Sequence, residues 1–260
     1  MIKVNKLSFS YGTDLVLRDL DLHLPEAAMT VMVGPNGAGK STLIYALLGF
    51  LKAQGGSVSL FGKALHLYKR SELAKLIAFV PQETSFQFDY SVRDIVLMGR
   101  YPYQGLMQTW LPSDHRVVDG ILEQLRLQGL AHRYYSQLSG GEKQRVLIAR
   151  ALAQDTRYIF LDETLSQLDI NHQVEIMLLL VDIVRQSRKG ILLISHNLNL
   201  GANFADQMVF LGGGRVLGQG EPSEMMRPEK LRELFGIDLQ VAMNPVSDRP
   251  NLLYPGKPLT

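Results

Sequence analysis

The chain has 260 residues, of which 46% are hydrophobic and 20% charged, and its formal net charge is +2. This length suits one large or two modest globular domains, and so small a charge gives no argument for a nucleic-acid partner. The absence of cysteine excludes disulfides and thiolate metal sites. The most apolar stretch, residues 174–184, contains two carboxylates and is too short to span a bilayer. We therefore expect a soluble protein that reaches a membrane only through a partner.

Short apolar strands alternate with helical stretches along most of the chain. This alternation is typical of an α/β protein with a largely parallel sheet. The expected strands are residues 2–9, 29–33, 58–60, 77–80, 158–161, 191–195, 207–211 and 215–217.

The alternation stops between Gln82 and Gln154, where the expected helices are residues 92–98, 115–125 and 142–153. A helical block between strands of one sheet indicates an inserted subdomain. We predict that it covers residues 85–156 and divides a catalytic core made of residues 1–84 and 157–220. Residues 221–260 contain several prolines, and we expect an irregular tail there with one helix at 229–235.

The most informative segment is a glycine-rich loop, residues 34–41, with the pattern G-x-x-x-x-G-K-S/T. An apolar run precedes it and a helical stretch follows, which is the context that a phosphate-binding loop requires. Glycines allow backbone N–H groups to point inward, and the start of a helix adds positive dipole. We predict that ATP phosphates bind to Gly34, Pro35, Asn36, Gly37, Ala38, Gly39, Lys40, Ser41 and Thr42.

Two acids end the apolar segment Tyr158-Ile159-Phe160-Leu161-Asp162-Glu163. Alone, this pattern also fits a solvated strand end. Together with the phosphate loop it supplies what phosphoryl transfer needs, with Asp162 and Ser41 as Mg²⁺ residues and Glu163 polarising the attacking water. A nucleotide kinase or GTPase would share the loop, but the guanine-reading pattern Asn-Lys-x-Asp does not occur in this chain.

The segment Leu138-Ser139-Gly140-Gly141-Glu142-Lys143-Gln144-Arg145 resembles the LSGGQ signature of ATP-binding-cassette (ABC) ATPases. The resemblance extends from about Tyr11 to Gly220. It implies a P-loop NTPase (RecA-like) core with antiparallel β strands at the N-terminal side and an inserted α-helical subdomain. It also implies that the signature opens a helix facing ATP held by the other subunit of a homodimer. The signature residues are Leu138, Ser139, Gly140, Gly141 and Glu142.

Further matches to the ABC family follow in the expected order along the chain. Tyr11 corresponds to the aromatic residue that stacks on adenine, and Gln82 to the Q-loop glutamine that touches Mg²⁺ and links to the transporter. Ser166 and Asp169 match the D-loop, which contacts the opposite active site. His196 follows an apolar strand and matches the switch histidine that senses the γ-phosphate, so the resemblance implies that it is catalytic together with the adjacent acids.

The chain departs from the family pattern directly after the acidic pair. ABC ATPases usually continue with Pro and then Thr or Ser, whereas this chain has Thr164 and Leu165. Loss of proline frees the backbone, and we expect Leu165 to lie near the dimer interface. Both acids remain, so the resemblance implies activity with an altered turnover rate.

Residues 91–100 and 168–173 are similar to subunits of bacterial importers for metal chelates, which serve ferric siderophores, haem, cobalamin or molybdate. This resemblance implies a homodimer on a separate permease dimer at the cytoplasmic face of the membrane, with a substrate-binding protein outside. The permease contacts expected from it are Gln82, Arg93, Met98 and Arg100. For Met98, simple packing inside the helical subdomain is a nearly equal interpretation.

A cassette ATPase of DNA repair or translation is the alternative from another class. Such proteins carry long coiled-coil insertions or two cassettes in one chain, and neither pattern is present in these 260 residues. The transporter interpretation is therefore favoured, and no nucleic-acid partner is expected.

Overall fold

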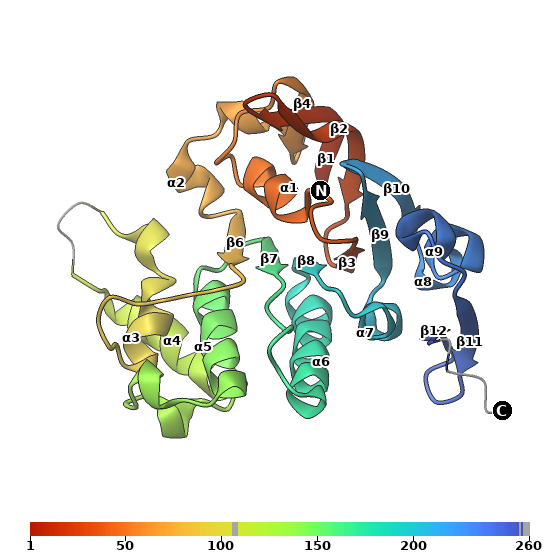
Figure 1. Cartoon of the computed structure of the whole chain (residues 1–260). Coiled ribbons are helices and arrows are strands. Elements are labelled where there is room, and N and C mark those ends of the chain that lie inside the picture. The colour runs from red at the N-terminus through yellow and green to blue at the C-terminus, as the bar shows by residue number, and fades with distance from the viewer. Residues whose placement is uncertain (106–108, 255, 257–260) are drawn as a thin grey trace.

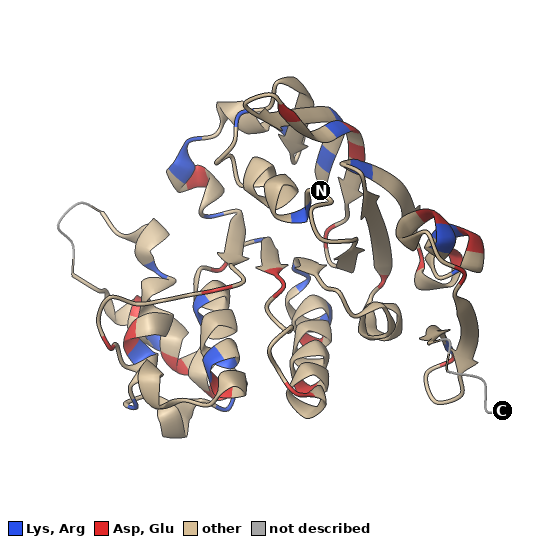
Figure 2. Cartoon of the chain, viewed as in Figure 1, with Lys and Arg blue, Asp and Glu red and all other residues tan. Residues whose placement is uncertain are grey.

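The computed structural model describes residues 1–105, 109–254 and 256, and Figure 1 shows their arrangement. A central sheet is bordered by an antiparallel sheet, by a group of helices and by a C-terminal lobe. None of the described helices is long and apolar enough to cross a membrane. Figure 2 shows acidic and basic residues interspersed over the ribbon, in keeping with the small net charge.

The central sheet has six strands in the order β10-β9-β3-β8-β7-β6. All neighbours are parallel except the edge strand β10. Every residue of β3, β7 and β8 is buried, because helices cover parallel sheets and strands of this kind become continuous apolar runs. The strand bounds are β3 Met29–Val33, β6 Ile77–Val80, β7 Tyr158–Asp162, β8 Gly190–Ile194, β9 Gln207–Gly212 and β10 Arg215–Gly220.

A second, antiparallel sheet occupies the N-terminal side, as the resemblance implied. Its order is β2-β1-β4-β5, with β1 Ile2–Tyr11, β2 Asp14–Leu24, β4 Gly55–Leu60 and β5 Lys63–Ala64. Strand β2 was not among the expected strands. Its apolar alternation is interrupted near Asp19, whose φ of 46° lies in the left-handed region and coincides with a shift in the register to β1.

In the described part of the chain, seven α-helices precede β9. Helices α3, α4 and α5 lie between β6 and β7 in the chain and gather at one side of the molecule, shown in yellow to green in Figure 1. The bounds are α1 Lys40–Leu47, α2 Arg70–Leu73, α3 Val92–Met98, α4 Pro112–Gln124, α5 Gly140–Ala153, α6 Ile170–Ser187 and α7 Leu198–Phe204. The three expected helices of this region are thus present, with starts up to three residues earlier than expected.

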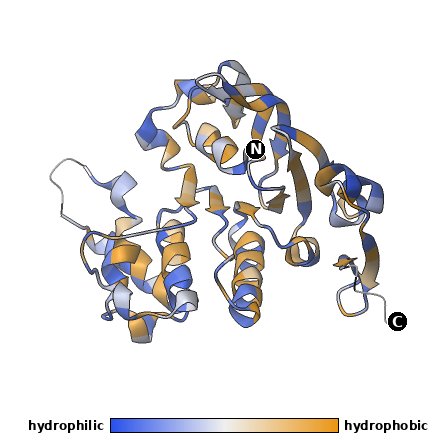
Figure 3. Ribbon diagram, in the orientation of Figure 1, coloured by the Kyte–Doolittle hydropathy of each residue, from blue (hydrophilic) through white to orange (hydrophobic). Residues whose placement is uncertain are grey.

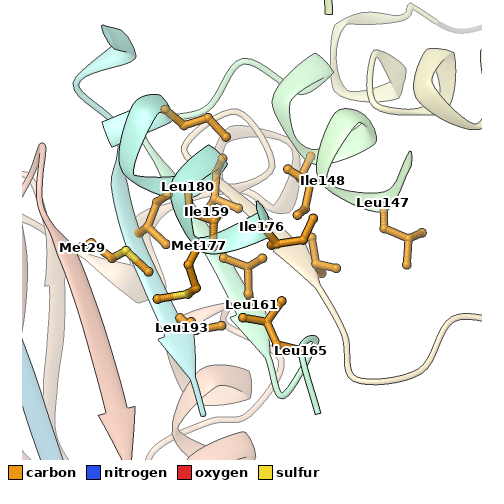
Figure 4. Packing of buried hydrophobic residues seen from close by; sticks show 14 of the residues in the cluster. Met29, Leu147, Ile148, Ile159, Leu161, Leu165, Ile176, Met177, Leu180 and Leu193 are labelled. Carbon is orange, nitrogen blue, oxygen red and sulfur yellow. The ribbon is translucent and has the colours of Figure 1, made fainter. Parts of the chain in front are cut away.

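Buried hydrophobic residues link the sheet to helices α5 and α6. Figure 3 shows hydrophobic colour on β6 and β7, and Figure 4 shows the packing beneath α6, where Leu161 and Leu193 lie close to Leu165. Leu165 is buried in this cluster, and its side chain fills the core behind the acidic pair. Its expected position near a dimer interface stays a prediction.

The C-terminal region is more regular than expected. Besides α9 (Pro228–Phe235), which confirms the expected helix, it contains α8 (Pro222–Met225) and a hairpin of β11 (Gln240–Asn244) and β12 (Arg249–Leu253). The expectation of an irregular tail is wrong for the hairpin. Its strands are short and β12 contains Pro250, a residue that a two-stranded edge tolerates but that obscures the strand signal.

Candidate nucleotide site

The site lies where three neighbouring parallel strands end. The phosphate loop follows β3, Asp162 is the last residue of β7, and His196 comes two residues after β8, which lies between them. Carboxyl ends of parallel strands meet at one edge of a sheet, which is where α/β proteins bind ligands. The fold thus brings together residues that are far apart in the sequence.

Two glycines give the loop its path. A Cβ on Gly34 would collide with the backbone oxygen of Leu211, and Gly39 has a φ of 98°, which favours glycine. Helix α1 begins directly after Gly39, so its first N–H groups face the loop. The loop borders a cavity of about 330 Å³ that is lined by Val16, Asn36, Gly37, Gly39, Lys40, Ser41, Thr42 and Glu163.

Lys40 is held inside this loop, with 4% of its surface exposed. Its Nζ donates hydrogen bonds to the carbonyl oxygens of Gly34 at 2.9 Å and Pro35 at 3.0 Å, and lies 3.8 Å from Oε1 of Glu163. Burial lowers the pKa of Lys40, although the nearby carboxylates oppose this effect. An anionic phosphate would supply the charge compensation that the loop carbonyls only partly provide.

Asp162 is 2% exposed, and among the described residues its Oδ1 has no hydrogen-bond partner. Ser41 of the loop interacts with this carboxylate, so the unpartnered oxygen lies next to the phosphate loop. Burial raises the pKa of Asp162, and the Ser41 hydrogen bond offsets only part of that rise. A buried carboxylate oxygen next to a hydroxyl fits Mg²⁺, which prefers oxygen ligands.

Glu163 is oriented by an unusual backbone and by His196. Its φ of 49° lies in the left-handed region, and its N–H donates to Ile194 O at 3.2 Å. The turn after it is closed by Ser166, whose N–H and hydroxyl both donate to Glu163 O, at 3.2 and 2.9 Å. This turn forms without the usual proline. The Glu163 side chain then reaches His196, with Oε1 and Nε2 2.6 Å apart.

The signature residues form the start of helix α5. Ser139 is its N-cap: Ser139 Oγ accepts from Glu142 N–H at 3.4 Å, while the Glu142 carboxylate accepts from Ser139 N–H at 2.8 Å. These hydrogen bonds lower the pKa of Glu142. Ser139 and Gly140 are exposed, whereas Leu138 and Gly141 are buried. None of these five described residues lines the phosphate-loop cavity of the same chain.

The two D-loop residues, Ser166 and Asp169, both form hydrogen bonds within their own loop. Asp169 caps α6, accepting a hydrogen bond from His172 N–H at 2.9 Å. That bond is the largest cause of the lowered pKa of Asp169. Gln173 stabilises the same loop by donating from Nε2 to Leu165 O and Leu168 O, at 3.0 and 3.1 Å. Ser166 and Asp169 are both exposed, which leaves them accessible to a second molecule.

Tyr11 and Gln82 lie apart from this cluster. Tyr11 ends β1, is half exposed and packs edge-on against Phe9 with ring centroids 4.9 Å apart. Gln82 follows β6 and is exposed. Neither residue lines the phosphate-loop cavity, so their roles toward adenine and Mg²⁺ stay predictions.

The expected permease residues divide into two groups. Arg100, with 13% of its side chain exposed, pairs with Asp114 at 3.0 Å and donates to Ala153 O at 2.8 Å. These contacts assign Arg100 to the internal structure of the helical insert, against the expected permease role. Arg93 pairs with the more exposed Asp119, and Met98 is half-buried on α3. For these two, a permease contact stays a prediction.

Several residues that line the two cavities were not anticipated, among them Val16, Gln173 and Tyr254. Val16 borders the phosphate-loop cavity from the unexpected strand β2, whose alternating leucines carried a signal. Gln173 and Tyr254 line a neighbouring cavity that also contains Glu163 and His196. Nothing in the sequence pattern connects either residue with the acids.

Together, these features form a glycine-rich P-loop beside two acids and a histidine, with the start of a second helix exposed elsewhere on the chain. Comparison with known proteins agrees. The ABC transporter family model matches residues 17–166, and the chain belongs to that family. It is an ABC-type ATPase subunit.

Two relatives and one solved structure show which members of the family this chain is similar to. The chain is 35% identical over 256 residues to the probable siderophore transport system ATP-binding protein YusV of Bacillus subtilis (strain 168), covering 98% of this chain and 93% of the relative. It is 37% identical to the hemin import ATP-binding protein HmuV of Bordetella avium, covering 94% and 95%. A structure of a metal-chelate type ABC transporter in an inward-facing conformation superimposes with a TM-score of 0.85 at 31% identity, covering 97% and 96%.

Proposed function

We propose that this chain is the ATP-hydrolysing subunit of a bacterial importer for metal chelates, with ferric siderophores as the favoured substrate class. The observation that carries the ATPase part is the convergence of Lys40, Asp162, Glu163 and His196 at one edge of the sheet. The substrate class is supported by relatives named for siderophore and hemin transport.

The residues divide the chemistry between them. Lys40 and the loop N–H groups bind the phosphates, and Glu163 accepts a proton from the attacking water. His196 orients the Glu163 carboxylate through the 2.6 Å contact. Asp162 and Ser41 would hold Mg²⁺, which supplies charge neutralisation when bound. Tyr11 and Gln82 are proposed to contact adenine and the metal site.

A homodimer follows from the position of the signature. Ser139 and Gly140 are exposed at the start of α5, and neither lines the phosphate-loop cavity of its own chain. A helix N-terminus of this kind binds anions, so the γ-phosphate that it meets is proposed to lie in a second copy. A symmetric pair would then enclose two nucleotides through the same surface on both subunits.

Transport requires a membrane component, and none of the helices in the described part of the chain is long and apolar enough to cross a membrane. We propose that a permease dimer binds the segment 82–98 at Gln82, Arg93 and Met98, which places the subunit at the cytoplasmic face of the membrane. The exposed Phe88 in the same segment suits an interface of aromatic, Met and Arg contacts. A substrate-binding protein would deliver the chelate from outside.

Growth of the source bacterium on defined iron sources tests this function. Deletion of the gene should abolish growth on ferric siderophore as the sole iron source, and the parental gene should restore it. The Glu163→Gln gene should not restore growth, although its product folds. Normal growth of the deletion strain on every siderophore, with loss of growth only on haem, would transfer the assignment to haem import.

A further inference from the structure

A cavity of about 290 Å³ lies beside the catalytic pair and includes a residue from the end of the chain. It is lined by Glu163 and His196, by Ser166 of the following turn, and by Tyr254. Glu163 also lines the phosphate-loop cavity, so the two cavities adjoin. A molecule that covers the phosphate loop from outside therefore comes next to Tyr254.

The C-terminal hairpin is fixed to the catalytic core by reciprocal hydrogen bonds. Leu252 N–H donates to Asn199 Oδ1 at 2.7 Å, and Asn199 Nδ2 donates back to Leu252 O at 3.1 Å. Leu252 itself is buried in the main hydrophobic cluster. Asn199 belongs to α7, the helix that begins directly after His196 and its neighbour Asn197. The hairpin is thus tied to the element that carries the switch histidine.

Asn203, one turn further along α7, holds both strands of the hairpin. Its Nδ2 donates to Asn251 Oδ1 at 2.5 Å, and its Oδ1 accepts from Asn244 Nδ2 at 3.0 Å. Asn244 ends β11 and Asn251 lies in β12. Half-buried polar contacts of this kind set the register and orientation of the hairpin, and Tyr254 directly follows its second strand.

Tyr254 is 80% exposed at this position. Among the described residues, its ring pairs with no other aromatic ring and its hydroxyl has no hydrogen-bond partner. A single exposed aromatic residue on a surface carries little meaning. Here the residue directly follows the hairpin and lines the cavity that contains Glu163 and His196, which the proposed second subunit would approach. Tyrosines in such positions are typical interface anchors.

We propose that the C-terminal hairpin is part of the subunit interface, and that the second copy buries Tyr254 when the homodimer closes on ATP. This inference rests on the proposed function, because it requires the ATP-bound homodimer. The hairpin then adds a contact beyond those of the phosphate loop and signature helix, and it connects subunit closure to α7 and His196.

Thiol labelling tests this burial directly, because the natural chain has no cysteine and gives no background. In a Glu163→Gln chain, which retains ATP, the Tyr254→Cys thiol should react with a maleimide at least about tenfold more slowly with Mg²⁺ and ATP than without nucleotide. The matched control is Leu67→Cys, an exposed site next to β5 in the N-terminal sheet. Its labelling rate should not change.

Size-exclusion chromatography of the same samples tests the homodimer separately from the role of the hairpin. A chain that stays monomeric with ATP overturns the homodimer and this inference together. A chain that dimerises while Tyr254→Cys keeps its labelling rate overturns only the role of the hairpin.

The affinity of the dimer provides a second measurement. Tyr254→Ala should weaken ATP-dependent dimerisation about tenfold, as truncation of an interface anchor does, and Tyr254→Phe should keep most of the affinity. ATP binding to the single subunit should be unchanged, because Tyr254 is absent from the phosphate-loop cavity. Equal dimer affinity for Tyr254→Ala and Leu67→Ala would contradict the proposal.

Discussion

At the scale of one residue, the ionised side chain of Asp162 lowers the stability of the folded protein. Its carboxylate is buried, one oxygen lacks a partner among the described residues, and burial raises its pKa. A raised carboxylate pKa means that the protonated form favours the folded state. The stability from this group is fully present below the ordinary value of 3.8 and is lost as the pH rises through the raised value.

Asp162→Asn is therefore expected to stabilise the nucleotide-free protein at neutral pH. The gain should be on the order of 1 kcal/mol, because Asn removes the buried negative charge but keeps a polar atom there, and it should shrink as the pH falls and Asp162 becomes protonated. Denaturant unfolding at several pH values measures it, and a Mg²⁺-dependent nucleotide-binding assay should show the accompanying loss. Destabilisation at pH 7 would mean that the free oxygen has a partner in solution.

Glu163→Gln isolates chemistry from binding. Gln keeps the size and hydrogen bonding of the side chain but cannot accept the proton of water as a carboxylate does. The hydrolysis rate should fall about 10²–10⁴-fold, while ATP affinity in calorimetry stays close to the parental value. Hydrolysis at the parental rate would show that another group is the base and that the Thr164-Leu165 turn belongs to a rebuilt site.

At the scale of elements, the helical insert depends on one nearly buried ion pair. Arg100→Ala would leave Asp114 buried without its partner, at a cost of about 3 kcal/mol in the free energy of unfolding. Arg93→Ala is the matched control, because its partner Asp119 is more than half exposed and such pairs contribute at most about 1 kcal/mol. Urea unfolding of both variants measures the difference, and equal losses would contradict the structural role given to Arg100.

The elements best predicted from sequence are those whose signal is local. Strand β3 and helix α3 have the predicted bounds, because a continuous apolar run and a Ser91 cap mark them directly. The meeting of the phosphate loop with Asp162 was predictable from the parallel alternation. Strand β2 was missed because a bulge at Asp19 breaks its period. The division into core, insert and tail by residue number stays a prediction.

The remaining features arise from tertiary packing that leaves no periodic pattern. Arg100 finds Asp114 only because α4 packs on α3, and the hairpin reaches the site through asparagines whose partners are about fifty residues away. The burial of Leu165 could not be predicted, because the family pattern has a proline in this turn. In this chain the Ser166 side chain closes the turn instead.

At the scale of the whole molecule, the proposed homodimer requires a small, uncharged residue at Gly140, where the signature helix would meet the nucleotide of the second copy. A Cβ on Gly140 would make an ordinary 3.6 Å contact with Leu168, so Gly140→Asp should fold. Its carboxylate would face the γ-phosphate of the second copy and abolish ATP-driven dimerisation in the Glu163→Gln chain. Light scattering measures this, with Gly140→Ala as the control that should still dimerise. A stable ATP dimer of Gly140→Asp would remove the signature from the interface.

The strand order of the central sheet has a consequence for synthesis on the ribosome. Strand β3, which ends at the phosphate loop, is flanked only by β8 and β9, formed by residues 190–194 and 207–212. The strand pairs of the N-terminal sheet come from residues up to 64 alone, so these strands can pair while translation continues. The nucleotide loop has to wait until four-fifths of the chain has emerged, because contacts between distant segments form late. A ribosome that stalls before that point therefore holds a nascent chain with an exposed apolar β3 and no ability to bind ATP.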